Sequence, residues 1–308
     1  MKEPRRASRR LFQTAALFTG LAVVMGSVVC ATDSGFECST WPGCYPDRLA
    51  PSQNDVIALL YRNPIIEFVH RFSAIMSGPL VLVAALVAMR LRSAGNLVKL
   101  LPWVAVAGAI AAGAFGRATV LGGIPTWAAA IDLFCALAAM GAMAVATVAL
   151  ERDPARWRPN RAGRLAWLSV ALLVPMHLLG VLVAGSGSYT RCMSWPVWEL
   201  VAADHSPAGQ VVRMVLAVGA LGAIAGSAAA ARRDASLRGN AVASVVLLVA
   251  VLALGLVIMT TQQITGWGML YSIATVGLLF SQVLLGARAS LQPAPVADEA
   301  PSRERVTV

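Results

Sequence analysis

Hydrophobic residues gather in eight long segments along the chain, and polar stretches separate them. Each segment is about 20 or more residues long, the length that a helix needs to cross the apolar core of a bilayer. The fold class that follows is an all-α polytopic membrane protein. The pattern predicts transmembrane helices at 11–31, 65–89, 100–122, 127–150, 165–185, 208–231, 241–261 and 266–287.

Charged residues make up 13% of the chain, whereas they form about 25% of a soluble domain. The net charge of +10 suggests a nucleic-acid partner, but 19 of the 25 Lys and Arg lie in the terminal stretches and in alternate connections between apolar segments. This is the positive-inside distribution of membrane proteins. We therefore expect a lipid bilayer as the environment, no nucleic acid, and both termini in the cytoplasm.

The first apolar segment has the basic start of a signal peptide. Its length of about 20 residues and the missing small-residue cleavage site favour a retained span. Long connections at 32–64 and 186–207 alternate with short ones and divide the chain into two halves. We expect a cytoplasmic tail 1–10, an N-terminal half 11–151, a linker 152–164, a C-terminal half 165–287 and a disordered tail 288–308.

A repeated motif supports two equivalent halves. The first long connection contains CSTWPGC at 38–44, and the second contains CMSWPVW at 192–198. Since each half has an even number of spans, the halves are expected to run parallel. The predicted architecture is two tandem four-helix bundles related by a pseudo-twofold axis along the membrane normal.

The cysteines differ in their expected chemistry. Cys38 and Cys44 lie in a connection assigned to the outer, oxidising side of the membrane, where a disulfide is expected and two free thiols are the alternative. Cys192 has no partner within its own motif, because a tryptophan stands at the second cysteine position. Cys30 and Cys135 lie in spans and are expected to be apolar filler.

Three ionisable residues open the second span: Glu67, His70 and Arg71. Glu67 and His70 are three residues apart, so they share one face of a helix. Ionisable groups within a membrane segment are costly and mark functional sites by default. The alternative is a salt-bridge cluster at the membrane interface that caps the helix.

The combination of TDSGFECSTWPGC at 32–44 with IEFVHR at 66–71, within eight spans in two halves, resembles the heme A synthase family. The resemblance covers about residues 10–287. It implies heme O as substrate in the N-terminal half, heme b as electron relay in the C-terminal half, and oxidation of a heme methyl to a formyl, giving heme A. Mapped by motif, it makes Glu67 catalytic and His70 a ligand of heme iron, with Arg71 beside a propionate.

The family pattern has four ligand histidines, whereas this chain has three histidines in all. Asp132 stands at the ligand position of the fourth span. In the sixth span Val212 takes the histidine position before a retained Arg213, and in the eighth the candidates are Tyr271 and Ser272. The resemblance therefore predicts at most one heme per chain, bound by His70, with Asp132 and Arg213 as further cofactor-site residues.

Asp132 and the other two histidines have structural alternatives. Asp132 is expected either to pair with Arg117 or to act as a weak iron ligand. His177 lies within the fifth span, where a hydrogen bond to a neighbouring carbonyl is the ordinary arrangement. His205 lies in the second long connection and is expected to be solvated.

The leading hypothesis is a heme A synthase-like oxidoreductase of a bacterial inner membrane that serves cytochrome oxidase biogenesis. The implied partners are heme O, heme O synthase, cytochrome oxidase assembly factors and further copies of the chain. One alternative is a catalytically impaired relative that handles heme or assists oxidase assembly. A second alternative is a small-molecule transporter, since parallel repeats also occur in that class.

Overall fold

A computed structural model describes residues 6–92, 94–152, 155–184, 189–196 and 207–293. Within these residues eight helices are long and apolar enough to cross a membrane, as predicted. Most extend beyond the predicted spans into polar sequence. Their bounds are α1 Arg6–Ala31, α2 Pro64–Arg90, α3 Asn96–Gly122, α4 Thr126–Glu151, α5 Arg161–Val183, α6 Pro207–Ala231, α7 Ala235–Thr261 and α8 Ile264–Ser290.

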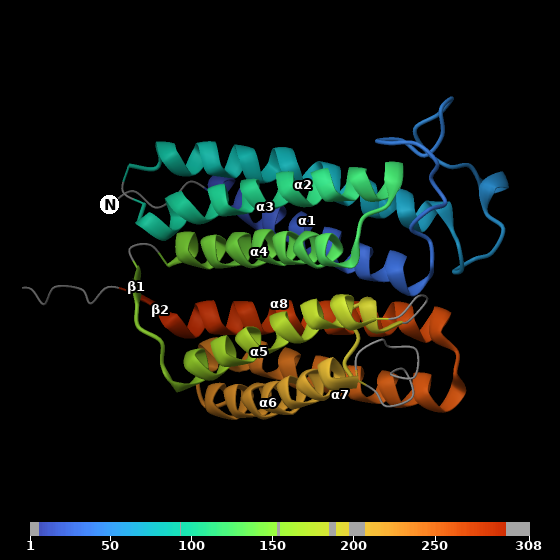
Figure 1. Cartoon of the computed structure of the whole chain (residues 1–308). Coiled ribbons are helices and arrows are strands. Elements are labelled where there is room, and N and C mark those ends of the chain that lie inside the picture. The colour runs from blue at the N-terminus through green and yellow to red at the C-terminus, as the bar shows by residue number, and fades with distance from the viewer. Residues whose placement is uncertain (1–5, 93, 153–154, 185–188, 197–206, 294–308) are drawn as a thin grey trace, which may run out of the picture.

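The eight helices form two groups of four that lie side by side (Figure 1). In the first group α1, α2, α3 and α4 pack in a ring, and in the second α5, α6, α7 and α8 do the same. The seam between the groups is made by α1 and α4 on one side and by α5 and α8 on the other. The all-α membrane fold is therefore confirmed, and the pseudo-twofold axis stays a prediction.

The two ends of the molecule carry different features. At one end the connection 32–63 folds over the first group, and we call this the cysteine end (Figure 1). At the other, the strand end, β1 (Ala155–Trp157) pairs antiparallel with β2 (Leu291–Pro293). The Arg152 guanidinium donates to the carbonyl oxygens of Arg288 and Leu291, 2.8 Å in the second case. These contacts tie the linker between the groups to the end of α8.

Two segments differ from the boundaries expected from the sequence. Residues 6–10, assigned to a tail, already belong to α1. Residues 288–293, assigned to a disordered tail, complete α8 and form β2. A hydropathy pattern detects only the apolar part of a helix, whereas the backbone remains helical through the polar interface. Residues 294–308 lie outside the described part of the chain.

Helix contact within the first group is closest between α3 and α4. A Cβ atom on Gly108 would lie 2.7 Å from the backbone oxygen of Cys135 and 3.1 Å from the Cβ of Ala139. A glycine at this point lets the two backbones approach directly. This contact helps to set the position of α4, which carries Asp132.

Candidate functional site

The start of α2 is fixed by its cap. Asn63 accepts a hydrogen bond on Oδ1 from the backbone N–H of Ile65 at 2.8 Å, and Pro64 occupies the first turn. Both are common choices at a helix N-terminus, where backbone N–H groups lack helical partners. The backbone N–H of Asn63 in turn donates to Ser34 Oγ at 3.0 Å. The helix therefore begins where the long connection returns to its own first residues.

Glu67 and Arg71 form a buried ion pair one turn into α2. Arg71 Nη2 lies 2.5 Å from Glu67 Oε1. Arg71 is 7% exposed and Glu67 is 2% exposed. The second carboxylate oxygen, Oε2, accepts from the backbone N–H of Cys38 at 2.8 Å. Burying two charges is costly unless each also has further hydrogen-bond partners. The long connection supplies these partners.

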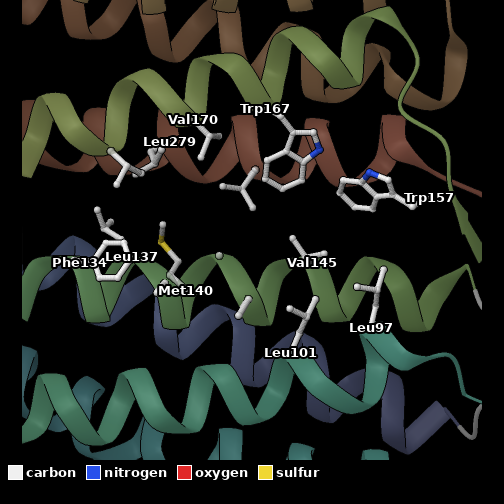
Figure 2. Close-up of a pocket in the computed structure, with 15 residues that line it drawn as sticks. Leu97, Leu101, Phe134, Leu137, Met140, Val145, Trp157, Trp167, Val170 and Leu279 are labelled. Atoms are coloured by element: carbon white, nitrogen blue, oxygen red, sulfur yellow. The ribbon is translucent and has the colours of Figure 1, made fainter. Parts of the chain in front are cut away.

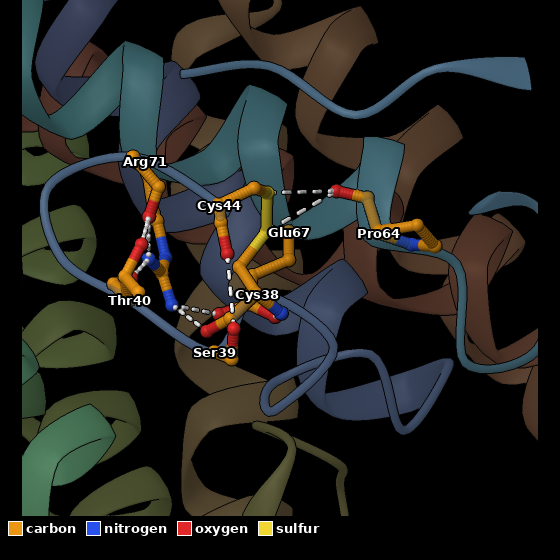
Figure 3. Close-up of polar contacts among 8 residues, drawn as sticks. Cys38, Ser39, Thr40, Cys44, Pro64, Glu67 and Arg71 are labelled. Atoms are coloured by element: carbon orange, nitrogen blue, oxygen red, sulfur yellow. Dashed lines mark hydrogen bonds and ion pairs between the residues drawn. A yellow bond between two sulfur atoms is a disulfide. The ribbon is translucent and has the colours of Figure 1, made fainter. Parts of the chain in front are cut away.

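The Arg71 guanidinium holds the cysteine loop, residues 38–44, against α2 (Figure 3). Nη2 donates to the carbonyl oxygen of Cys38 at 2.9 Å, and Nη1 donates to those of Gly43, at 2.9 Å, and Thr40. Four acceptors, counting Glu67, thus surround one side chain. In this arrangement Arg71 and Glu67 position the loop, which gives both residues a structural role beside the predicted ones.

Cys38 and Cys44 are joined by a disulfide, as expected from the sequence, and both are buried. Their sulfur atoms lie 3.7 and 4.0 Å from the carbonyl oxygen of Pro64, so the bridge rests on the first turn of α2. Trp41 at the tip of the loop lies with its ring centroid 5.9 Å from the Arg117 guanidinium carbon. That distance is within cation–π range.

His70 faces the first helix rather than the loop. Its Nδ1 lies 3.1 Å from the carbonyl oxygen of Ala22 in α1. A backbone carbonyl can only accept, so Nδ1 carries the proton in this contact and Nε2 is the unprotonated nitrogen. This is how metal-ligating histidines are commonly oriented. His70 is half-buried and offers one lone pair.

Asp132 lies on α4, across the ring from His70. Since α1–α4 pack in a ring, α2 and α4 occupy opposite corners. His70 and Asp132 each follow the first residue of their helix by six positions, about 9 Å along that helix. Among the described residues no ion pair joins Asp132 to Arg117, so the predicted structural pair is wrong. The Arg117 guanidinium lies over the ring of Trp41 instead.

Arg213 plays the corresponding part in the second group. It is fully buried, and its Nη2 donates to the Ser194 carbonyl oxygen at 2.7 Å, in the connection that precedes α6. Nε donates to the carbonyl oxygen of Met176 at 3.1 Å, and Nη1 donates to Gln210 Oε1 at 2.9 Å. Both groups therefore use a buried arginine, about two turns into their second helix, to hold the preceding connection.

The ligand positions of the second group hold no metal-binding side chain aimed at a common centre. Val212 is 49% exposed and points away from the core. Tyr271 is buried, and its hydroxyl accepts from the backbone N–H of Trp195 at 2.9 Å. Ser272 donates to the Ser27 carbonyl oxygen at 3.3 Å. Tyr271 thus holds the connection before α6, and Ser272 links α8 to α1 across the seam.

His177 does not make the carbonyl hydrogen bond expected of it. It is 1% exposed, and within the described part of the chain neither ring nitrogen has a hydrogen-bond partner. Tyr189, another buried residue of the second half, donates to the Gly268 carbonyl oxygen at 3.0 Å. Burial raises the pKa of the Tyr189 phenol, which keeps it a neutral donor. His205 lies outside the described residues.

A second disulfide, Cys30–Cys192, was missed by the sequence analysis. It joins the last turn of α1 to the connection before α6, over a separation of 162 residues. The interpretation of Cys30 as apolar filler is therefore wrong, because its thiol meets a cysteine of the other group. A usable signal existed: two unpaired cysteines at the same expected side of the membrane. Cys135 is free.

The fold and this site define a polytopic helical membrane protein with a histidine, a buried carboxylate–arginine pair and a disulfide loop at one end. A family model described as cytochrome oxidase assembly protein, COX15-CtaA, matches residues 9–297. The chain therefore belongs to the COX15-CtaA family, which confirms the resemblance stated from the sequence. No curated protein matches the chain. Family membership supports a role in cytochrome oxidase assembly.

The two groups differ in how well they fit a heme. In the first, His70 has a fixed tautomer and one lone pair, which suits an axial iron ligand. In the second, the outward Val212 and the engaged Tyr271 hydroxyl leave the family's ligand positions without an imidazole. The described residues at these positions therefore do not fit a bis-histidine heme b.

Proposed function

We propose that the chain is a heme A synthase-type protein that takes heme O in its first helix group, with His70 as the protein ligand to the iron of this substrate. The observation that carries the proposal is the state of His70. The contact with Ala22 fixes its proton on Nδ1 and leaves Nε2 to coordinate. Asp132, on the opposite helix of the ring, is the carboxylate that would be a second, weaker ligand.

The reaction turns a methyl group into a formyl group. With water as the oxygen source it is R–CH₃ + H₂O → R–CHO + 4 H⁺ + 4 e⁻, so protons must leave a membrane-buried site and the electrons must pass to an acceptor. Glu67 is the carboxylate nearest to His70 in the helix, one turn away, and we assign it the proton-accepting role. Its ion pair with Arg71 holds the carboxylate in place beside the cysteine loop.

The setting of this reaction is a bacterial inner membrane with the cysteine end outside. The basic connections at the strand end support this orientation. Heme O synthase would supply the substrate, and assembly factors or further copies of the chain would be the protein partners. A reporter fused after Arg288 should read as cytoplasmic; a periplasmic signal would contradict the orientation.

A heme-handling or assembly role without catalysis is the second candidate. The observation that favours it is the second group, where Val212, Tyr271 and Ser272 at the ligand positions supply no imidazole for an electron-relaying heme. Electrons for a full reaction would then leave by another route. The transporter alternative loses support because the described helices α1–α8 run without the breaks that mark transport sites.

The test is co-expression of the full chain with a heme O synthase, followed by purification. A pyridine hemochrome assay counts hemes, and chromatography of extracted pigment separates heme O from heme A. We expect at most one heme per chain, and heme A in the extract. His70→Ala should abolish heme retention, whereas the control His177→Ala should leave it nearly unchanged.

The outcomes separate the two candidates. Retained heme O without heme A supports the heme-handling role. Two low-spin hemes per chain would overturn the ligand assignment in the second group. Full heme retention in His70→Ala would remove the basis of the proposal.

A further inference from the structure

An apolar groove of about 390 Å³ lies in the seam between the two helix groups (Figure 2). Phe134, Gly141 and Val145 of α4 form one wall. Trp167 of α5 and Leu279 of α8 form the opposite one.

The lining of the groove is apolar. Its fifteen side chains are hydrophobic or glycine, and the polar side-chain atoms among them are the two indole nitrogens. Trp167 Nε1 already donates to Ser290 Oγ at 3.0 Å. Such a lining suits hydrocarbon and offers nothing to a polar ligand.

The groove has the length of one membrane leaflet. Its wall on α4 runs from Phe134 to Val145, which are eleven residues apart and therefore about 16 Å along the helix. Half of a hydrocarbon core about 30 Å thick is about 15 Å. A single acyl chain lying along α4 would thus fill the groove from the bilayer centre to the strand end.

The strand end of the groove carries the groups that mark a membrane interface. Trp157 of β1 and Trp167 of α5 lie there with ring centroids 5.7 Å apart (Figure 2). Tryptophan favours the level of lipid headgroups, because its ring is apolar and its N–H is polar. Pairing of Trp157 with Leu291 in the β1–β2 ladder holds this aromatic pair at the mouth.

Positive charge surrounds the same mouth. Arg156 and Arg158 flank Trp157 in the chain, and both are exposed. A basic pair at headgroup level attracts anionic lipid.

We propose that the groove is a binding site for an anionic phospholipid of the leaflet at the strand end. One acyl chain lies between α4 and the α5–α8 wall, and the phosphate headgroup lies near Arg156 and Arg158. The bound lipid fills the space between the two helix groups and completes their seam. The site does not depend on the heme chemistry proposed above.

Native mass spectrometry of the full chain, released from nanodiscs that contain equal parts of phosphatidylglycerol and phosphatidylcholine, tests the site. We expect one phosphatidylglycerol to stay bound. Gly141→Leu places a side chain into the groove, where a Cβ meets nothing within 4 Å, and should reduce retention at least tenfold. The matched control is Gly113→Leu on α3, where a Cβ also meets nothing within 4 Å; it should leave retention unchanged.

A double variant tests whether the basic side chains select an anionic headgroup. Arg156→Gln with Arg158→Gln should lower the preference for phosphatidylglycerol over phosphatidylcholine by about tenfold or more. Equal retention of both lipids by the unaltered protein would overturn the anionic headgroup. Equal loss in Gly141→Leu and Gly113→Leu would overturn the groove, and a retained prenyl compound in place of phospholipid would assign the groove to another occupant.

A fluorescence measurement covers the case in which Gly141→Leu fails to fold. The unaltered protein is placed in phosphatidylcholine vesicles with a few per cent of phosphatidylglycerol brominated on its acyl chains. A bound brominated lipid should quench part of the tryptophan emission at this low fraction, and Trp167→Phe should lose that part. Quenching that rises only in proportion to bulk bromolipid, in both proteins, would contradict a site.

Discussion

At the scale of single residues, Arg71 shows how one side chain joins several parts of the site. Its guanidinium contacts the carboxylate of Glu67 and three carbonyl oxygens of the cysteine loop. Arg213 makes a comparable set of contacts in the second group. In both places a buried arginine donates to a backbone carbonyl of the preceding connection.

Replacing Arg71 with Gln should strongly destabilise the protein. The substitution leaves the Glu67 carboxylate buried without its counter-charge, which costs about 3–5 kcal/mol. Thermal unfolding of the purified protein should show a clearly lower Tm. The control is Arg62→Gln, which removes an ion pair with Glu37 whose arginine side chain is 57% exposed; it should cost less than about 1 kcal/mol. Equal effects of the two variants would argue against the clamp.

Asp132→His should complete a bis-imidazole site if heme binds as proposed. The new imidazole would stand on α4, at the corner of the ring opposite the helix that carries His70. The absorption spectrum of the purified variant should change from high-spin to low-spin. Asp132→Asn, which keeps the size but adds no strong ligand, should remain high-spin. An unchanged spectrum in Asp132→His would show that the iron does not lie between these helices.

Sequence reasoning identified Glu67, His70 and Arg71 as a unit, because charged groups at a helix start within an apolar segment stand out. It could not find their partners. The loop carbonyls that bind Arg71 and the α1 carbonyl that binds His70 are backbone atoms, which carry no sequence signal. The pairing of Asp132 with Arg117 failed for a related reason: their closeness in sequence, on helices joined by a short connection, did not reveal the nearby ring of Trp41.

At the scale of the helices, hydropathy was a sufficient guide to number and order. The boundaries moved outward because caps, and not apolarity, decide where a helix starts. Asn160 and Asp234 accept from backbone N–H groups at 2.9 and 2.8 Å and begin α5 and α7 within polar sequence. The β1–β2 pair was missed since three-residue strands in basic connections have no distinctive alternation.

Gly108→Ala should loosen the contact of α3 with α4. The added Cβ would meet the Cys135 carbonyl oxygen at 2.7 Å, and neither backbone can yield cheaply. We expect a loss of about 1–3 kcal/mol, as for other overpacked sites. Gly113→Ala in the same helix meets nothing within 4 Å and should be neutral or slightly stabilising. Thermal unfolding of both variants is the measurement, and equal Tm values would show that the contact is not close.

At the scale of the whole molecule, the Cys30–Cys192 disulfide should hold the two helix groups together even when the chain is cut. A protease site inserted after the exposed Pro159, between α4 and α5, allows such a cut. After cleavage the two fragments should migrate as one band without reductant and separate with it. Cys30→Ser should give separate fragments in both conditions. Two bands without reductant in the unaltered protein would contradict the cross-link.

The same cross-link has a consequence for the order of events during synthesis. Cys44 follows Cys38 by six residues, whereas Cys192 follows Cys30 by 162. At about 5–20 residues per second, the second partner of Cys30 is made roughly 8–30 s after it. The loop bridge can therefore close while translation is still in the first half, and the long bridge only after the fifth helix has been inserted. The Cys30–Cys192 bond therefore forms only in chains whose first five helices have already been made and inserted.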